Sequence, residues 1–420
     1  QKHGLIFTTS GTEELLWYNE SNGITVRVVC SFMSWKGEHT MRKHLKPFIF
    51  TALACTFLLG AGVSAQAASK SSDVAINDTN FSEELMIYAK DADKNQDGYL
   101  SAKEADTVTR IALESNKNTD IFKGIQYFTE LETFKFDSYI DRRNPEEIGE
   151  EEKNTVQKLN LSGMEKLEKV TVDCGNPYLK EINLEGCKRL NDVYIAGDDQ
   201  NIQALNLKQC TDLQRLYCRS VAVKKLNLSG YKKLEDVDIG GGTIQILNLK
   251  KCPSLVKLFV SSDELTKLKL KDSKNLETAM IFAYSLKSVD LSTNTKLKKL
   301  VCELPACSSL DLSRNKELKN LNCSYSEGLR EVNVSGCKKL RAIRCNHSGL
   351  KKLNVKKNTN LQVLLCKQTN IKKLNLKNNR NLKQLECNNT NIKELNLSNT
   401  RIRESSALKC DPDVTVTYAK

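Results

Sequence analysis

The sequence contains little of what enzymes and zinc sites use most. Only four histidines occur among 420 residues, and His347 is the only one beyond residue 67. No Cys-x-x-Cys pair is present, so the common spacing of zinc and dithiol redox sites is missing. A catalytic site would have to use carboxylates alone, with no recurring nucleophile and base beside them. These absences argue against an enzyme, a zinc protein or a redox protein.

Tryptophan is also scarce, and its two copies, Trp17 and Trp35, both lie in residues 1–40. This segment begins without a methionine and precedes Met41, which opens a basic stretch. We therefore interpret residues 1–40 as a start-site artefact. The alternative is a genuine extra domain, which would have to survive upstream of a signal peptide, where export would not normally spare it.

Residues 41–67 are typical of a secretory signal peptide. A basic stretch is followed by the apolar run 48–63, and the small residues at 65–67 suit cleavage. The run is shorter than the ~20 residues that cross a bilayer, so a retained membrane span is the weaker alternative. Lipid attachment at Cys55 fits poorly, because the apolar run continues beyond it. We predict a secreted protein that begins near Ala68 and has no membrane span.

A short repeat dominates the rest of the chain. The pattern Leu-x-x-apolar-x-apolar recurs every 21 to 23 residues, with its first leucine at positions 167, 190, 213, 234, 255, 276, 297, 318, 340, 361 and 382. One such unit has too little apolar surface to fold alone and must bury it against its neighbours. The repeat therefore predicts a parallel solenoid of eleven coils.

Each unit also contains a second short strand motif about ten residues later, as in 205–207, 226–228, 353–355, 374–376 and 395–397. Each coil should therefore have two strand faces. Three or four residues further on, where the backbone turns, stands an asparagine or a cysteine: Asn294, Asn315, Asn358, Asn379, Cys187, Cys210, Cys252 and Cys337. We expect these side chains to stack between coils.

The alternation of a Leu-x-x-Leu-x-Cys segment with a Leu-Asn-Leu segment resembles the bacterial leucine-rich repeats of the nested 21-residue kind, and the plan is similar to that of the internalins. The resemblance covers residues 74–420. It implies a leucine-rich-repeat parallel β-solenoid, horseshoe-shaped or gently curved, at a bacterial cell surface, and it says little about the ligand. One departure is that hydroxyl residues replace the asparagine that the family often places after the cysteine segment, at Ser326, Ser348, Thr369 and Thr390.

Thirteen cysteines lie beyond residue 67, and export would ordinarily favour disulfides. Six of them occupy the inward strand position, where other units carry valine or isoleucine: Cys218, Cys302, Cys323, Cys345, Cys366 and Cys387. A free cysteine packs there as a small hydrophobe. Four more are at the turn position, which leaves Cys174, Cys307 and Cys410 without a repeat role. Strands ~4.8 Å apart do not exclude disulfides between coils, but the spacing favours reduced thiols.

Residues 93–104 fill every fixed position of the twelve-residue EF-hand loop. The expected ligands are the side chains of Asp93, Asn95, Asp97 and Ser101, the carbonyl of Tyr99 and both carboxylate oxygens of Glu104. Gly98 permits the sharp turn. An acidic surface turn is the alternative. We predict a calcium ion with a structural role, because EF-hands that sense calcium usually work in pairs and this loop is solitary.

Helix-compatible sequence flanks the loop, from Phe81 to Tyr88 before it and from Ala105 to Leu113 after it. With the segment up to Phe136 it resembles the helical cap that precedes the repeats of internalin-like proteins. The predicted order is therefore an EF-hand cap at 68–136, an acidic insertion at 137–156, leucine-rich repeats at 157–409 and a C-terminal capping strand at 410–420.

The chain stays basic after processing. Removal of residues 1–67 takes away six of 64 basic and four of 51 acidic residues, leaving 58 against 47 and a net charge of +11. This balance permits attraction to an anionic cell-wall polymer or to nucleic acid. Lysines also keep a long solenoid soluble, and we take this as their main role. We retain the anionic polymer as a secondary partner and expect no nucleic-acid partner.

Alternate strand residues face solvent, and on the Leu-x-x-apolar-x-apolar strands the central one varies from unit to unit. In order these residues are Thr171, Tyr194, Tyr217, Asp238, Phe259, Met280, Val301, Asn322, Arg344, Leu365 and Glu386. We predict partner binding at Tyr194, Tyr217, Phe259, Met280 and Val301, with Arg215, Arg219, Lys257 and Phe282 alongside. Aromatic, methionine and arginine side chains are enriched at protein interfaces. The alternative is that strands simply favour aromatics.

The function predicted from the sequence is recognition of another macromolecule, a protein first of all, by a secreted and calcium-stabilised solenoid. A glycan or cell-wall polymer binder is the alternative, and a carboxylate-based hydrolase ranks below it.

Overall fold

A computed structural model of the chain describes residues 15–19, 24–28, 73–77, 79–114, 121–138, 157–174, 179–197, 202–219, 221–403 and 407–418. The chain divides into two units, Gln1–Gly62 and Val63–Lys420. In the first, β1 (Leu15–Asn19) and β2 (Ile24–Val28) form an antiparallel pair. The predicted signal peptide at 41–67 and the glutamates of the predicted acidic insertion lie outside the described residues. No described helix has the length and apolar composition required to span a bilayer.

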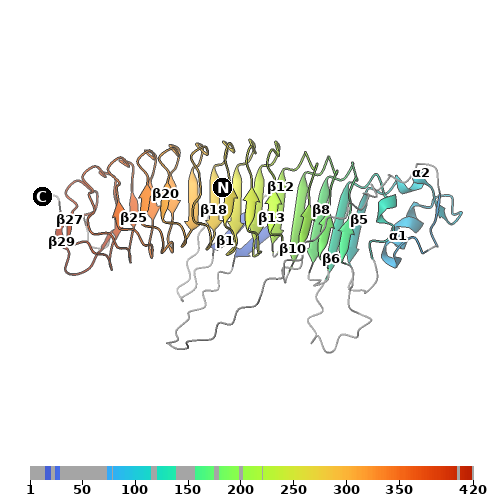
Figure 1. The fold of residues 1–420 in the computed structure, drawn as a ribbon, viewed down its shortest axis with the longest axis horizontal. Helices are drawn as coiled ribbons and strands as arrows, with labels where there is room; N and C mark the ends of the chain where they lie inside the picture. Colours follow the sequence, from blue (N-terminus) through green and yellow to red (C-terminus); the bar gives the residue numbers. More distant parts are fainter. Residues whose placement is uncertain are drawn as a thin grey trace, which may run out of the picture. The chain divides into compact units, whose positions relative to one another are not determined.

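The second unit is a parallel β-solenoid built on one sheet of fourteen strands (Figure 1). Its strands, in spatial and sequence order, are β5 (Arg110–Glu114), β6 (Thr133–Ser138), β8 (Lys169–Cys174), β10 (Asp192–Gly197), β12 (Arg215–Arg219), β14 (Asp236–Gly240), β16 (Lys257–Ser261), β18 (Thr278–Phe282), β19 (Lys299–Glu303), β21 (Asn320–Asn322), β23 (Ala342–Arg344), β25 (Val363–Leu365), β26 (Gln384–Glu386) and β28 (Leu408–Lys409). We call it the large sheet. It confirms the predicted leucine-rich-repeat solenoid.

The motif at 374–376, which was predicted as a strand, and its counterpart at 289–291 are not in strands. In the other coils the second strand motif forms short parallel sheets on the other side. They contain β7 (Lys158–Asn160), β9 (Glu181–Asn183) and β11 (Ala204–Asn206); β13 (Lys225–Asn227), β15 (Ile246–Asn248) and β17 (Lys267–Lys269); β20 (Ser309–Asp311), β22 (Glu331–Asn333) and β24 (Lys352–Leu353); and β27 (Glu394–Asn396) with β29 (Thr415–Thr417). The repeat leucines point between the two sides and are almost fully buried. Strand β29 pairs with β27 and so covers the last coil.

The turn-position asparagines link one coil to the next. The Nδ2 atom of Asn315 donates to the carbonyls of Leu291 (3.0 Å) and Asn294 (2.9 Å), and Asn294, Asn358 and Asn379 repeat this pattern. The cysteines at the same position each donate from Sγ to one carbonyl of the preceding coil, as Cys187 does to Leu161 (3.1 Å). The predicted stacking between coils is confirmed.

The twelve cysteines whose side chains are described are free thiols, and all but Cys410 are buried. Burial raises the pKa of Cys187 and of Cys323 to about 12. Thiols that stay protonated are poor nucleophiles and poor metal ligands. The prediction of reduced, core-packing cysteines is thus confirmed for the eleven that are buried.

The hydroxyl residues that replace the family's second asparagine do not build a matching ladder. Ser348, Thr369 and Thr390 donate to the carbonyl three residues earlier in their own turn, at 2.6 to 2.8 Å. A hydroxyl has a single proton to donate, and this local bond uses it. Ser326 differs, because its Oγ accepts from the amide of Leu304 in the preceding coil.

The N-terminal part of the unit corrects one prediction. Helix α1 (Glu83–Ala92) precedes the loop, but α2 (Ala102–Ala105) ends after four residues, followed later by the 3-10 helix η1 (Ile125–Tyr127). The helix expected to reach Leu113 is wrong. Ile111 and Leu113 are buried while Arg110 and Glu114 are exposed, and this period of two makes the segment strand β5. The repeat therefore begins two coils before Leu167, in β5 and β6.

Turn geometry changes along the solenoid. Up to residue 272, the non-glycine residues of the coils that have positive φ follow the short strands: Gln209, Lys251 and Asp272. From residue 325 on, they follow the large-sheet strands: Tyr325, His347, Gln368 and Asn389. The large-sheet strands shorten at the same place, from five residues in β19 to three in β21. In each of these coils the left-handed residue lies three residues after the last strand residue, so the shorter strands and the left-handed turns occur together.

Candidate binding face and calcium loop

The variable strand residues form one row across the exposed side of the large sheet, which we call the variable face. Strand register places Tyr194 opposite Tyr217, Phe259 opposite Met280, and Met280 opposite Val301. The remaining members of the predicted row, from Thr171 to Glu386, follow in the same register. All are half-buried except Arg344, which is exposed. The sequence thus predicted correctly which residues lie side by side.

Aromatic rings and one arginine form a continuous cluster on this face. The rings of Tyr194 and Tyr217 are stacked, with centroids 4.5 Å apart and planes inclined by 4°. The guanidinium of Arg219 lies over the rings of Tyr217 (5.2 Å) and Phe259 (4.6 Å). Phe282 packs against Phe259 at 5.8 Å. Such contacts hold the rings in fixed positions and reduce the entropy that binding would cost.

A bidentate ion pair sits inside the cluster. Arg219 donates from Nε and Nη2 to the two carboxylate oxygens of Asp238, both at 2.8 Å. The two side chains are 27% and 25% exposed, so the pair is shielded from most solvent. Burial raises the pKa of Asp238, and the hydrogen bonds and charge of Arg219 oppose that shift. The pair fixes the guanidinium between the two rings. We call Tyr194, Tyr217, Arg219, Asp238, Phe259 and Phe282 the aromatic–arginine cluster.

The other predicted partner-binding residues surround this cluster. Arg215 pairs with Asp192 at 2.9 Å, and Lys257 pairs with Asp236 at 3.5 Å, both on the strand-start side of the face. Burial, then Tyr217 and Asp173, raise the pKa of Tyr194 to about 12. The Tyr194 hydroxyl is therefore a neutral hydrogen-bond donor at physiological pH.

Two residues at or beside the variable face were not among the predicted binding residues. Asp238 was placed in the row but not recognised as the partner of Arg219. Tyr284, just after β18, is 50% exposed and donates from its hydroxyl to Glu303 at 2.5 Å. Because Tyr284 lies outside the repeat pattern, the only signal for it was an aromatic two residues after Phe282.

The predicted calcium-binding side chains accept hydrogen bonds from backbone amides of their own loop. Asp93 Oδ2 accepts from the amide of Gly98 (3.2 Å), Asn95 Oδ1 from Asp97 (3.0 Å), and Asp97 Oδ1 from Tyr99 (2.9 Å). Gln96 and Gly98 have positive φ, as the sharp turn requires. The loop edge β4 (Tyr99–Leu100) pairs with β3 (Val74–Ala75) of the same chain.

Two observations bear on whether the loop fits an ion. Oδ1 of Asp93 is buried without a hydrogen-bond partner, which is what a bound cation would satisfy. Glu104, by contrast, accepts from the Ser101 hydroxyl (2.7 Å), the Ser101 amide (3.1 Å) and the Lys94 amide (3.1 Å), and these bonds lower its pKa. The Glu104 amide in turn donates to the Ser101 hydroxyl oxygen, which completes a capping box. Among the described residues no three His, Cys, Asp or Glu side chains are grouped to hold a metal. The all-oxygen donors fit calcium if Glu104 exchanges these bonds for the ion.

Comparison with known proteins finds no matching family model and no matching curated protein. Among solved structures, the chain is similar to the functional domain of InlJ from Listeria monocytogenes, which includes a cysteine ladder, at 18% identity over 77% of each chain and a TM-score of 0.38. It is also similar to the internalin InlF of Listeria monocytogenes, at 16% identity over 82% of this chain and 97% of that one, with a TM-score of 0.45.

A leucine-rich-repeat protein of Leptospira interrogans matches at 14% identity over 76% of this chain and 97% of that one, with a TM-score of 0.37. At identities and TM-scores this low, the similarity does not extend to ligand or function.

Proposed function

We propose that this chain is a binding protein that recognises another protein through the aromatic–arginine cluster of its variable face. The observation that carries the proposal is the unbroken contact from Tyr194 through Tyr217, Arg219 and Phe259 to Phe282 on the exposed side of the sheet. Tyrosine and arginine dominate the binding energy of protein interfaces, most of all where neighbouring groups hold them rigid. In this proposal the chain is exported and acts outside the cell.

The binding test uses the full chain, with calcium, on arrays of purified extracellular proteins and cell-wall glycans. Loss of three anchoring rings in Tyr194→Ala, Tyr217→Ala and Phe259→Ala together is expected to weaken protein binding by at least ~100-fold, since truncating one anchor costs about 2 kcal/mol or more and the effects of neighbouring anchors are not additive. The readout is the dissociation constant from a surface-binding titration, with circular dichroism to verify the fold.

A matched control removes an aromatic pair that lies off the face. Tyr325 and His347 are stacked at 4.9 Å in the turns after the large-sheet strands, so Tyr325→Ala with His347→Ala should leave binding unchanged. Equal loss in both variants, or binding to glycans alone, would place the site elsewhere and overturn the proposal. A hydrolase screen of the wild-type protein tests the enzymatic alternative.

We also propose that the 93–104 loop holds calcium and thereby stabilises the N-terminal end of the solenoid. Asp93, Asn95, Asp97, Ser101 and Glu104 would supply side-chain oxygens, and Tyr99 its carbonyl. With an affinity of about 0.1 to 1 mM, 10 mM calcium would stabilise the folded cap by about 1.4 to 2.7 kcal/mol.

This gain should appear in urea unfolding of the wild-type protein and vanish in Asp93→Asn. The asparagine keeps an oxygen that can accept from the Gly98 amide, but it lacks the carboxylate charge that would bind the ion. Asp91→Asn, an exposed aspartate two residues outside the loop, should keep the full calcium effect. A calcium effect of equal size in both variants would disprove the site.

A further inference from the structure

The C-terminal coils contain an uninterrupted run without acidic residues. Residues 332–385 include fourteen lysines and arginines and not one aspartate or glutamate. Thirteen of the fourteen are exposed. Among ion pairs within the described residues, only Lys339 with Glu317 involves this run. The positive charge here is therefore almost entirely uncompensated.

Earlier coils differ in having acidic residues interspersed among their lysines, and some of these lysines pair with an acid one coil away. Examples are Lys188 with Glu165, Lys208 with Glu185, Lys233 with Asp212 and Lys298 with Glu277. Solubility would be served as well by this interspersed arrangement, which avoids self-repulsion. A run of one sign destabilises the folded coils, so its presence indicates a partner of opposite charge.

Repetition arranges six of these lysines in rows on the short-strand side. Lys351, Lys352 and Lys356 recur 21 residues later as Lys372, Lys373 and Lys377, and all six are exposed. The two coils are in direct contact, because Asn378 Nδ2 donates to the Lys356 carbonyl (3.0 Å) and Asn379 Nδ2 to the Asn358 carbonyl (2.9 Å). Successive lysines in a row are therefore offset by about one strand spacing, ~4.8 Å. We call these six residues the basic rows.

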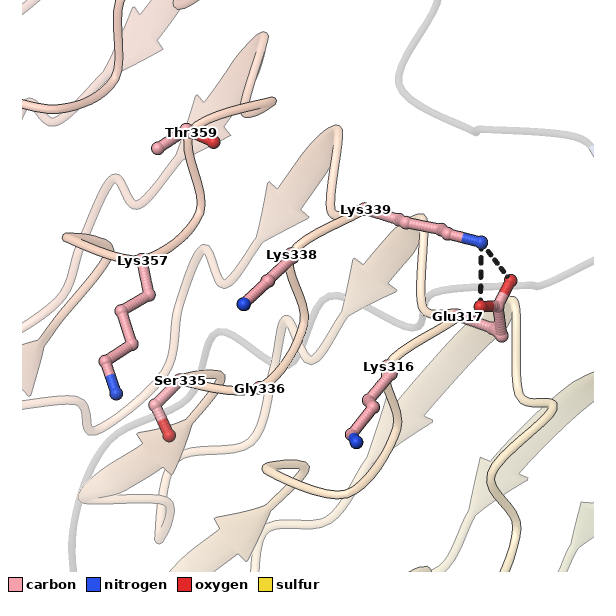
Figure 2. A pocket seen from close by; sticks show the side chains of 8 residues that line it. All are labelled: Lys316, Glu317, Ser335, Gly336, Lys338, Lys339, Lys357 and Thr359. Carbon is pink, nitrogen blue, oxygen red and sulfur yellow. Dashed lines mark hydrogen bonds and ion pairs between the residues drawn. The ribbon is translucent and has the colours of Figure 1, made fainter.

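An open hollow of about 770 Å³ adjoins the rows and is lined by more lysines (Figure 2). The amines of Lys316, Lys338 and Lys357 lie around the turn at Ser335 and Gly336, while Lys339 is turned away to Glu317. None of the three amines forms an ion pair with the residues that the structure describes. The hollow gives the basic surface a concave end, suited to seating an anionic group.

We propose that the basic rows and this hollow bind a flexible linear polymer of phosphodiester groups that carries no bases. Lysine ammonium groups bind phosphate as point charges, and a polymer can satisfy several rows at once. Residues 332–385 contain no phenylalanine, tyrosine or tryptophan, so this surface offers no aromatic platform on which bases would stack. This surface is separate from the variable face, and its function does not depend on the protein-binding proposal.

The test measures binding of the full chain to poly(glycerol phosphate) over a range of salt concentrations. One variant combines Lys352→Gln, Lys356→Gln, Lys373→Gln and Lys377→Gln. Its matched control combines Lys188→Gln, Lys208→Gln, Lys233→Gln and Lys298→Gln, which removes the same charge from paired lysines, three of them exposed and Lys298 half-buried. The first variant should lose at least about tenfold in affinity at 50 mM salt, and its log–log salt slope should fall by roughly two to three.

The control should keep the wild-type salt slope and bind within about twofold of the wild-type protein, which is expected if net charge alone does not drive binding. Equal loss in both variants, no saturable binding of wild type, or tighter binding to dextran sulfate or to an oligonucleotide would overturn the proposal. The variant with alanine at 194, 217 and 259 should bind the polymer normally, which separates this result from the test of the variable face.

Discussion

Replacing Gly336 by alanine is expected to destabilise the solenoid by about 3 kcal/mol. A Cβ atom at this position would lie 1.7 Å from the carbonyl oxygen of Ser313 and 2.7 Å from its carbon, both in the preceding coil. These are backbone atoms of a packed neighbour, so neither can rotate away. The two coils must separate, which also weakens the contact of Cys337 Sγ with the Leu312 carbonyl (3.2 Å).

Gly163 provides the matched control, because it occupies the same repeat position with nothing within 4 Å of the added Cβ. Its φ of 78° makes alanine strained there by about 1 kcal/mol, without any collision. Urea unfolding of both variants measures the two costs. If Gly336→Ala lowers the free energy of unfolding no more than Gly163→Ala does, the two coils can move apart at little cost and the prediction is wrong.

Removing the amide in Asn315→Ala should cost about 3 kcal/mol. The substitution removes two buried hydrogen bonds, to the carbonyls of Leu291 and Asn294, and each lost bond costs about 0.5 to 1.5 kcal/mol because both carbonyls keep one backbone donor. It also opens a void between coils. One contribution stabilises the variant instead: Oδ1 of Asn315 is itself buried without a hydrogen-bond partner, and removing it relieves that penalty.

Asn315→Cys is the informative companion, because the chain itself uses cysteine at this position in four other coils. A thiol donates to one carbonyl and fills most of the space, so we expect about half the cost of alanine. Thermal and urea unfolding would both report it. If the alanine and the cysteine variants both lose little stability, the asparagines contribute little to coupling between coils.

The period of the repeat accounts for most of the part of the fold that could be predicted from the sequence. Leucine spacing defined the coils from residue 167 on and the register of the variable face. It failed at Leu131-x-x-Phe134-x-Phe136, which has the same pattern with phenylalanine and forms β6. The long segment between this unit and Leu167 interrupts the 21-residue spacing, so the first two coils were interpreted as part of a cap.

Side-chain geometry within the site was less accessible to sequence reasoning. Neighbours directly opposite in register, such as Tyr194 and Tyr217, follow from the repeat. Arg219 instead reaches diagonally to Asp238 in the next coil, and which rings flank it depends on rotamers that no periodicity encodes. A basic residue two positions after an aromatic, with an aspartate one coil on, is the signal that would have found this pair.

The shift in turn geometry divides the stack into two blocks that meet between residues 272 and 325. Each coil couples only to its neighbours, so a solenoid behaves as a one-dimensional array that separates at its weakest junction. Strands of three residues give the C-terminal block fewer ladder hydrogen bonds per coil than strands of five. That block should open first under denaturant, taking the basic rows with it, while the aromatic–arginine cluster stays folded on the other side of the junction.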